Sequence, residues 1–203
     1  MLLVGGKIMT YGLIFYWCSW LFWGIITFFM KKGTLRTALS LLILMSILFS
    51  NFNFSIGGYV IFLPFLFLVT VSLFLYARLP KTLYQFFCSF ILMIGYTAIL
   101  FWEYSTTIYL FVSDIFLLPI ICCILINLVV KGLYSRIIIS MFGTAGGEIL
   151  HGLIMESYHL PKIIGSQDFF VILYIVLLFQ LLLHIYKKAK ANFYTFVISY
   201  LKS

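Results

Sequence analysis

Residues 137–155 read IIISMFGTAGGEILHGLIM, an apolar run that contains one Glu and one His. A helix needs roughly 20 apolar residues to cross about 30 Å of hydrocarbon, so a run of this length predicts a membrane span. Glu148 lies near the middle of the run, where an isolated carboxylate is costly. The stretch therefore predicts a membrane fold with an unusual polar position inside it.

The composition of the whole chain also indicates a membrane protein. Of 203 residues, 65% are apolar and 9% are charged, whereas about 25% of residues are charged in soluble domains. The net charge of +8 comes from 13 Lys and Arg against 5 Asp and Glu. Because the basic residues are scattered between apolar runs, they do not indicate a nucleic-acid partner. The lipid bilayer is the expected surrounding.

Seven apolar runs predict seven membrane spans. They cover residues 11–30, 37–54, 59–77, 83–101, 107–130, 137–155 and 169–186. The first run is followed by Lys31 and Lys32 and lacks a cleavage pattern, so we expect a retained span rather than a signal peptide. The loops leave no room for a soluble module. The prediction is an all-α fold: a polytopic transmembrane helical bundle that forms a single domain over residues 1–203.

The basic residues also predict an orientation, because cytoplasmic loops retain Lys and Arg. With the N-terminus outside, 11 of the 13 basic residues fall on the inner side, and Lys7 and Lys162 remain outside. We therefore expect a multi-pass plasma-membrane protein with its N-terminus outside and its C-terminus inside. The basic segment 187–203 is then a cytoplasmic tail. Its aromatic residues favour an interfacial helix, although its lysines equally fit simple retention of positive charge.

Glu148 and His151 form the first candidate site, because a spacing of three residues places them on one helical face. Asp114 in the fifth span is the best partner, since Pro119 kinks that helix and frees a backbone carbonyl near the Asp. Alternatively, Ser113 and Asp114 cap a shorter helix. Glu-x-x-His is also a metal-ligand spacing, but di-iron bundles need it twice, and it occurs once here.

Four glycines surround this pair and are candidates for close helix packing. They are Gly143, Gly146, Gly147 and Gly152. Small residues let a neighbouring backbone approach, and its polar groups can then satisfy a buried acid. Glu148 and His151 therefore have two interpretations, a packing lock or a proton or ion site.

A second group of polar residues is predicted at the outer face. It consists of Glu103, Glu156, His159 and Asp168. The group is either a vestibule that attracts cations or a hydrated loop. The cysteines Cys18, Cys88, Cys122 and Cys123 lie within apolar runs and are expected to be small buried hydrophobes. No metal site and no cofactor is predicted.

The chain lacks the motifs of known nucleophilic and metallohydrolase sites, such as GxSxG and HExxH. The leading functional hypothesis is a non-enzymatic accessory, scaffold or sensor protein that acts with a membrane-protein partner or as a homo-oligomer. The alternative is a small transporter or a proton- or cation-translocating protein that uses Glu148, His151 and Asp114. An enzyme embedded in the membrane ranks third.

Three features together resemble a known family. They are the opening span IFYWCSWLFWGIITFFMKK (residues 14–32), the layout of seven spans, and GGEILHG (residues 146–152). The chain is similar in these respects to the YphA-type membrane proteins of Bacillus-like Gram-positive bacteria. The resemblance implies a bacterial plasma membrane, and it carries over no catalytic or binding residue.

Overall fold

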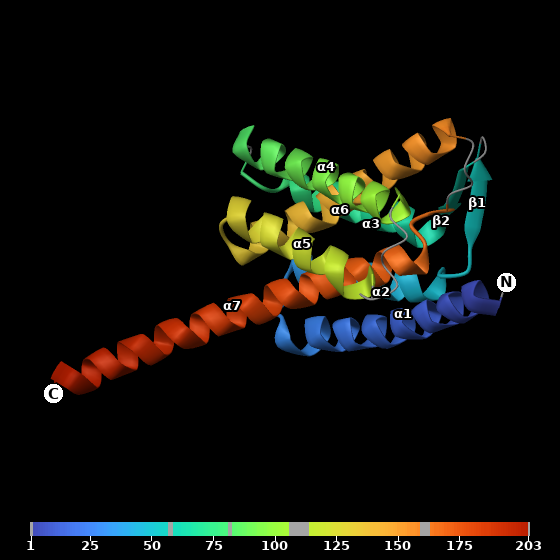
Figure 1. Ribbon diagram of the computed structural model, residues 1–203. Helices are drawn as coiled ribbons and strands as arrows, with labels where there is room; N and C mark the ends of the chain where they lie inside the picture. The colour runs from blue at the N-terminus through green and yellow to red at the C-terminus, as the bar shows by residue number, and fades with distance from the viewer. Residues whose placement is uncertain (1, 57–58, 81–82, 106–113, 159–162, 203) are drawn as a thin grey trace.

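The computed structural model describes residues 2–56, 59–80, 83–105, 114–158 and 163–202, and this part of the chain is predominantly helical. The helices are α1 (Leu2–Phe29), α2 (Thr34–Leu48), α3 (Leu63–Ala77), α4 (Leu83–Ser105), α5 (Asp114–Val129), α6 (Leu133–Ser157) and α7 (Gln167–Lys202). The strands are β1 (Asn53–Ile56), β2 (Tyr59–Phe62) and β3 (Ile163–Ile164). The helices form a bundle with the strands at one end, and α7 projects beyond the other end (Figure 1).

Helix α6 is the centre of the bundle. It packs against α3, α4, α5 and α7. Its buried residues include Ile138, Ile139 and Met141, all at most 1% exposed. Because α6 contacts so many neighbours, any polar residue on its buried faces must find its partners within the protein.

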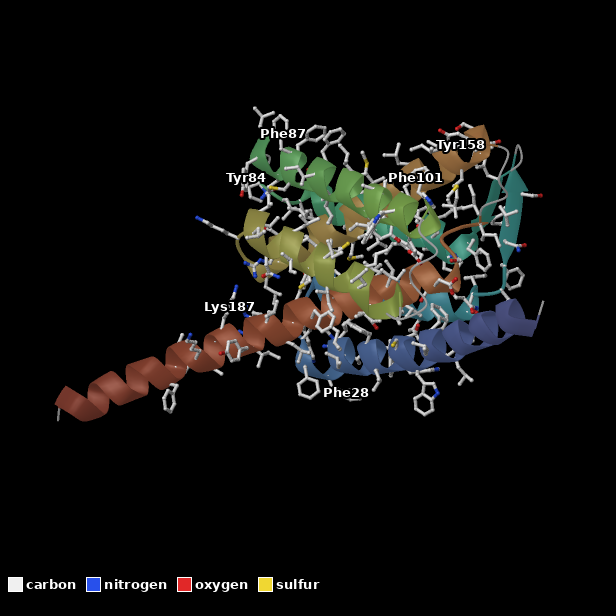
Figure 2. The ribbon with its side chains drawn as sticks, viewed as in Figure 1. Phe28, Tyr84, Phe87, Phe101, Tyr158 and Lys187 are labelled. Atoms are coloured by element: carbon white, nitrogen blue, oxygen red, sulfur yellow. The ribbon has the colours of Figure 1, made fainter. Side chains whose placement is uncertain are left out.

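The outside of the bundle is apolar. Phe28 at the end of α1 is 78% exposed and Phe87 on α4 is 59% exposed, and both side chains point outward in Figure 2. Large exposed apolar surfaces are rare on soluble monomers and are typical of surfaces that contact lipid. The helical bundle is therefore built to sit in a membrane.

Among the described residues, four helices contain a segment long and apolar enough to cross a bilayer. These segments are Gly12–Phe29, Leu83–Glu103, Leu133–Ser157 and Gln167–Phe193. Three apolar segments are shorter: Arg36–Leu48, Leu63–Ala77 and Leu117–Val129. They correspond to the predicted spans 37–54, 59–77 and 107–130. Residues 106–113, which include the start of the last of these, lie outside the described part of the chain.

The sheet accounts for the shortness of α2 and α3. Strand β1 pairs antiparallel with β2, with Asn53 opposite Phe62, and β2 pairs parallel with β3, with Val60 opposite Ile163. The predicted helical span 37–54 was therefore too long at its C-terminal end, and the predicted span 59–77 was too long at its N-terminal end. The sequence contains the signal of a hairpin, because Phe52, Phe54 and Ile56 alternate with polar residues before Gly57 and Gly58.

A turn at Gly165 joins the sheet to α7. Gly165 has a φ of +71°, a conformation that glycine adopts without strain. A Cβ at this position would lie 2.3 Å from the Cβ of Phe65 on α3. The positive φ and the close contact with Phe65 both require glycine at position 165, and together they fix where α7 begins.

Helix α7 continues well past its predicted end at residue 186. Its 36 residues give a length of about 54 Å, against about 30 Å of hydrocarbon. The side chains from Leu182 to Phe193 are all exposed. The segment 187–202 is thus a continuation of α7, because no proline or glycine interrupts the run after Gln167.

Candidate functional site

Glu148 and His151 both lie on the buried side of α6. Glu148 is 3% exposed and His151 is 5% exposed. Their spacing along the helix places them on neighbouring parts of one face, as the sequence predicts. The two ionisable side chains are therefore held inside the bundle and do not face lipid.

Glu148 receives a hydrogen bond from the neighbouring helix. The hydroxyl of Tyr96 on α4 donates to Oε2 of Glu148 over 3.2 Å, and Tyr96 is itself only 1% exposed. His151 packs edge-on against the ring of Phe101 on the same helix α4, with the ring centroids 5.0 Å apart. Both members of the pair thus contact α4, and Tyr96 is a site residue that the sequence alone did not identify.

The glycines of α6 allow this close approach to α4. A Cβ at Gly147 would lie 2.9 Å from the carbonyl oxygen of Met93, and one at Gly143 would lie 2.7 Å from Leu92 Cδ2. A Cβ at Gly146 would lie 3.0 Å from the sulfur of Met93. Thr97 of α4 donates a hydrogen bond over 3.0 Å to the carbonyl oxygen of Gly147. The backbones of the two helices are therefore in near contact beside Glu148.

Gly152 faces a different neighbour. A Cβ at Gly152 would lie 2.8 Å from the side chain of Ile164 in β3. This glycine brings α6 against the sheet rather than against α4. The four candidate packing glycines thus divide into three at the α4 contact and one at the sheet.

The polar face of α6 extends beyond the predicted pair. Ser140, Thr144 and Glu148 follow one another at intervals of four residues, and Ser140 and Thr144 are completely buried. Thr144 Oγ1 donates to the carbonyl oxygen of Ser140 over 2.7 Å. Gln180 on α7 donates from Nε2 to Ser140 Oγ over 2.6 Å. This periodicity was visible in the sequence, whereas the contact with Gln180 was not.

A separate buried network joins α1, α2 and α7. The hydroxyl of Tyr174 accepts a hydrogen bond from Ser19 over 3.3 Å and lies 3.1 Å from the Oγ of Ser46. All three residues are at most 2% exposed. Polar contacts therefore link the helices at two places in the interior, as expected where neither water nor lipid can satisfy polar groups.

The family of the chain follows from its sequence. The family model for YphA-like integral membrane proteins matches residues 11–203. The chain belongs to this family. No curated protein and no solved structure shows significant similarity to it. The match covers the polar face of α6 and the contact with α4, and it agrees with the resemblance inferred from residues 14–32 and 146–152.

The third predicted member of the intramembrane site cannot be placed beside Glu148. In this YphA-like protein α5 begins at Asp114, and the side chain of Asp114 lies outside the described part of the structure. Pro119 lies within α5 and is buried. Whether Asp114 reaches the Glu148 region stays a prediction.

The predicted outer-face residues lie at the ends of three helices. Glu103 is near the end of α4, Glu156 near the end of α6 and Asp168 in the first turn of α7. His159 falls outside the described residues. Within the described ranges, no three His, Cys, Asp or Glu side chains gather in a way that could hold a metal ion. The four cysteines are free thiols, and Cys88, Cys122 and Cys123 are buried.

Three cavities of this YphA-like protein are large enough to describe. One, of about 620 Å³, runs along α1. A second, of about 70 Å³, is enclosed by apolar side chains of α1, α2, α6 and α7. A third, of about 410 Å³, lies beside Tyr84 and Lys131. Neither Glu148 nor His151 lines any of these three cavities.

Proposed function

We propose that this YphA-like protein is a non-enzymatic accessory, scaffold or sensor protein of the plasma membrane. The observation that carries the proposal is the contact between α4 and α6, where Gly147 packs on the Met93 carbonyl and Tyr96 bonds Glu148. A buried acid that receives a hydrogen bond from its neighbour stabilises one helix arrangement, because separating the helices would break this bond. Glu148 and His151 then serve as a lock between helices.

The proposed topology is seven crossings with the N-terminus outside. It is supported by the gathering of basic residues at the end of the bundle opposite the sheet. Arg78 at the end of α3 donates to Thr34 at the start of α2 over 3.0 Å, and Arg136 near the start of α6 donates to the carbonyl oxygen of Val130 over 2.7 Å. This basic end is the cytoplasmic end under the positive-inside rule.

The scaffold role gives α7 a specific task. Lys187 lies where α7 leaves the bundle (Figure 2), and Lys188 and Lys190 follow it in the exposed part of the helix. In the proposed orientation this part is cytoplasmic. A rigid basic helix that leaves the membrane offers a contact surface for a partner protein or for anionic lipid headgroups.

A second candidate is a proton or cation pathway along α6. It is favoured by the series Ser140, Thr144, Glu148 and His151, which places buried polar groups over about 16 Å of one helix face. Chains of such side chains can conduct protons across membranes. The contact of Glu148 with Tyr96 and the close approach of α4 at Gly147 favour the lock over the pathway.

Replacing Glu148 separates the two functions. Glu148→Gln keeps the shape and the acceptor for Tyr96 but cannot titrate, Glu148→Leu removes both properties, and Glu156→Gln is the matched control near the end of α6. The readouts are abundance in the membrane, the phenotype and co-purifying proteins of a deletion strain complemented with each variant, and proton flux into proteoliposomes.

For a lock, Glu148→Gln behaves as the wild type while Glu148→Leu loses abundance, and no variant conducts protons. The pathway would be established instead by three results together. The wild type conducts protons, Glu148→Gln has normal abundance, and Glu148→Gln loses both the proton flux and the ability to restore the phenotype. The control Glu156→Gln is expected to behave as the wild type in every assay.

A further inference from the structure

The cavity along α1 is a groove whose polarity changes from one end to the other. Its lining consists of Gly12, Leu13, Tyr16, Trp17, Trp20, Asn51 and Gln167. Residues 12, 16 and 20 recur at intervals of four, so the groove follows one face of α1 for about 12 Å. It starts at the sheet end of the bundle and descends two turns toward the middle of the predicted first span.

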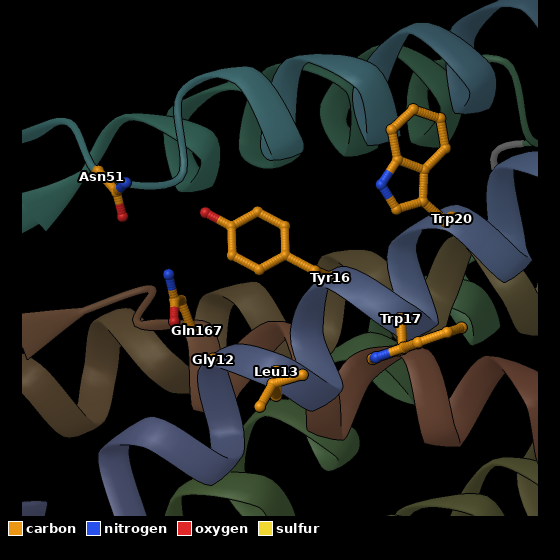
Figure 3. Close-up of a pocket in the computed structure, with 7 residues that line it drawn as sticks. All are labelled: Gly12, Leu13, Tyr16, Trp17, Trp20, Asn51 and Gln167. Atoms are coloured by element: carbon orange, nitrogen blue, oxygen red, sulfur yellow. The ribbon is translucent and has the colours of Figure 1, made fainter.

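The polar groups are concentrated at the sheet end. The side-chain amides of Asn51, which precedes β1, and Gln167, the first residue of α7, point toward one another, and the Tyr16 hydroxyl points into the space beside them (Figure 3). That hydroxyl also lies 2.7 Å from the Oγ of Ser50. Amides and hydroxyls both donate and accept hydrogen bonds. This end of the groove is therefore suited to a ligand that carries hydroxyl groups.

The deeper end is apolar and open to the surroundings of the protein. Leu13 is 58% exposed, Trp17 is 68% exposed and Trp20 is 54% exposed. In a membrane these side chains face lipid, and Trp rings favour the region where headgroups meet acyl chains. The groove thus has the same order of polarity as a lipid molecule, with hydrogen-bonding groups at the end of the bundle and apolar surface toward the hydrocarbon.

The charges around the groove select the kind of headgroup. None of the residues that form its described lining is charged. The nearest acid in sequence is Asp168, which is next to Gln167, exposed, and would repel an anionic phosphate. Gly12 leaves room at the polar end, because a Cβ there would lie 3.0 Å from Gln167 Oε1.

We propose that this groove binds one membrane lipid with an uncharged, hydroxyl-rich headgroup, as in a neutral glycosyl diacylglycerol. The headgroup hydroxyls bond Asn51, Gln167 and Tyr16, and one acyl chain lies along Tyr16 and Trp20. The assignment is independent of the role of Glu148, because the groove and the Glu148 region share no lining residue. In the proposed orientation the lipid comes from the outer leaflet.

The test uses the full-length protein purified with an equimolar mixture of glucosyl diacylglycerol and phosphatidylglycerol that have the same acyl chains. Native mass spectrometry measures the ratio of the two lipids retained. We expect an enrichment of the neutral glycolipid of about tenfold, which corresponds to roughly one net hydrogen bond more for the sugar than for the glycerol headgroup of phosphatidylglycerol. The double variant Asn51→Leu with Gln167→Leu is expected to bring the ratio close to one. The matched control Gln85→Leu, an amide at the opposite end of the bundle, is expected to keep the enrichment.

A second measurement does not depend on the folding of the double variant. In a Trp23→Phe, Trp102→Phe background, a glycolipid with brominated acyl chains quenches Trp17 and Trp20 when it occupies the groove. Gly12→Leu is expected to remove this quenching, because its side chain fills the polar end of the groove. The variant is expected to fold, because only the flexible end of Gln167 has to move. The proposal would be overturned if the wild type retained both lipids equally or enriched phosphatidylglycerol. It would also be overturned if the double variant kept the enrichment of the glycolipid. Efficient disulfide formation between two Trp17→Cys chains would overturn it as well, because a second copy would then cover the groove.

Discussion

Tyr96 on α4 and Glu148 on α6 share a hydrogen bond of 3.2 Å in the interior of the bundle, between residues 52 positions apart in sequence. Neither side chain faces lipid, since Tyr96 is 1% and Glu148 is 3% exposed. The bond joins the two helices at the same level as the Gly147 contact. The contribution of the hydrogen bond and that of the Gly147 contact are therefore measured with separate variants.

A double-mutant cycle with Tyr96→Phe and Glu148→Leu measures this bond, because neither variant can form it. Hydrogen bonds between neutral groups in membrane helices contribute on average about 0.6 kcal/mol, whereas bonds to charged groups contribute about 1.5–3 kcal/mol. We expect a coupling energy of at least about 0.6 kcal/mol, because the bond lies in the interior of the bundle. Unfolding of the purified protein in mixed micelles gives the four free energies. A coupling energy of zero would contradict the bond.

Gly147→Ala tests the close approach of α4 and α6. The new Cβ would lie 2.9 Å from the Met93 carbonyl oxygen, which is backbone and cannot move aside cheaply. We expect a loss of about 1–3 kcal/mol in the free energy of unfolding. Gly24→Ala is the matched control on α1, because no atom lies within 4 Å of its Cβ position. If both variants melt alike, the tight contact between α4 and α6 does not exist in the membrane.

Gln180→Leu tests how the interior accommodates a polar side chain. The substitution removes the bond to Ser140, but it also removes the Oε1 atom, which has no hydrogen-bond partner among the described residues. These effects oppose each other, so we expect a change in stability within about 1 kcal/mol. Ser140→Ala, which leaves the Gln180 amide unsatisfied, is expected to be the more damaging change. The reverse order in thermal unfolding would show that Gln180 has another partner.

Cysteine labelling tests the proposed orientation. In a cysteine-free background, Ser55→Cys in β1 and Ser157→Cys at the end of α6 are both exposed and are expected to react with an impermeant maleimide on intact cells. Lys32→Cys and Lys188→Cys lie at the basic end and are expected to react only after permeabilisation. Labelling of Lys188→Cys and protection of Ser55→Cys on intact cells would invert the topology.

The helical segments could be predicted because each is an apolar run, and the chain has few charges to interrupt them. The start of α3 could not be read from hydropathy, since strand β2 (YVIF) is as apolar as the helix that follows it, and the apolar residues of β1 extend the run that begins in α2. Their alternation and the Gly57-Gly58 pair were the better signal. Length and apolar content alone do not distinguish a long helix from a shorter helix followed by a strand.

The candidate site was predictable only along its own helix. The spacing of Glu148 and His151, and also that of Ser140 and Thr144, follows from the period of the helix. Tyr96, Thr97 and Gln180 belong to other helices, and nothing in their local sequence marks them as neighbours of α6. The glycines predict that another helix comes close, but they could not identify that helix as α4.

The continuity of α7 has a mechanical consequence. The helix starts at the turn beside Phe65, and its side chains are exposed from Leu182 to Phe193. Over a length of about 54 Å, a tilt of about 5° at the sheet displaces the far end by about 5 Å. The chain thus contains a lever that joins one side of the bilayer to the other. In the proposed orientation, bending or thinning of the membrane near the sheet would move the C-terminal end of α7 laterally. Lys187, Lys188 and Lys190, about 30–35 Å along the helix, would move by about 3 Å.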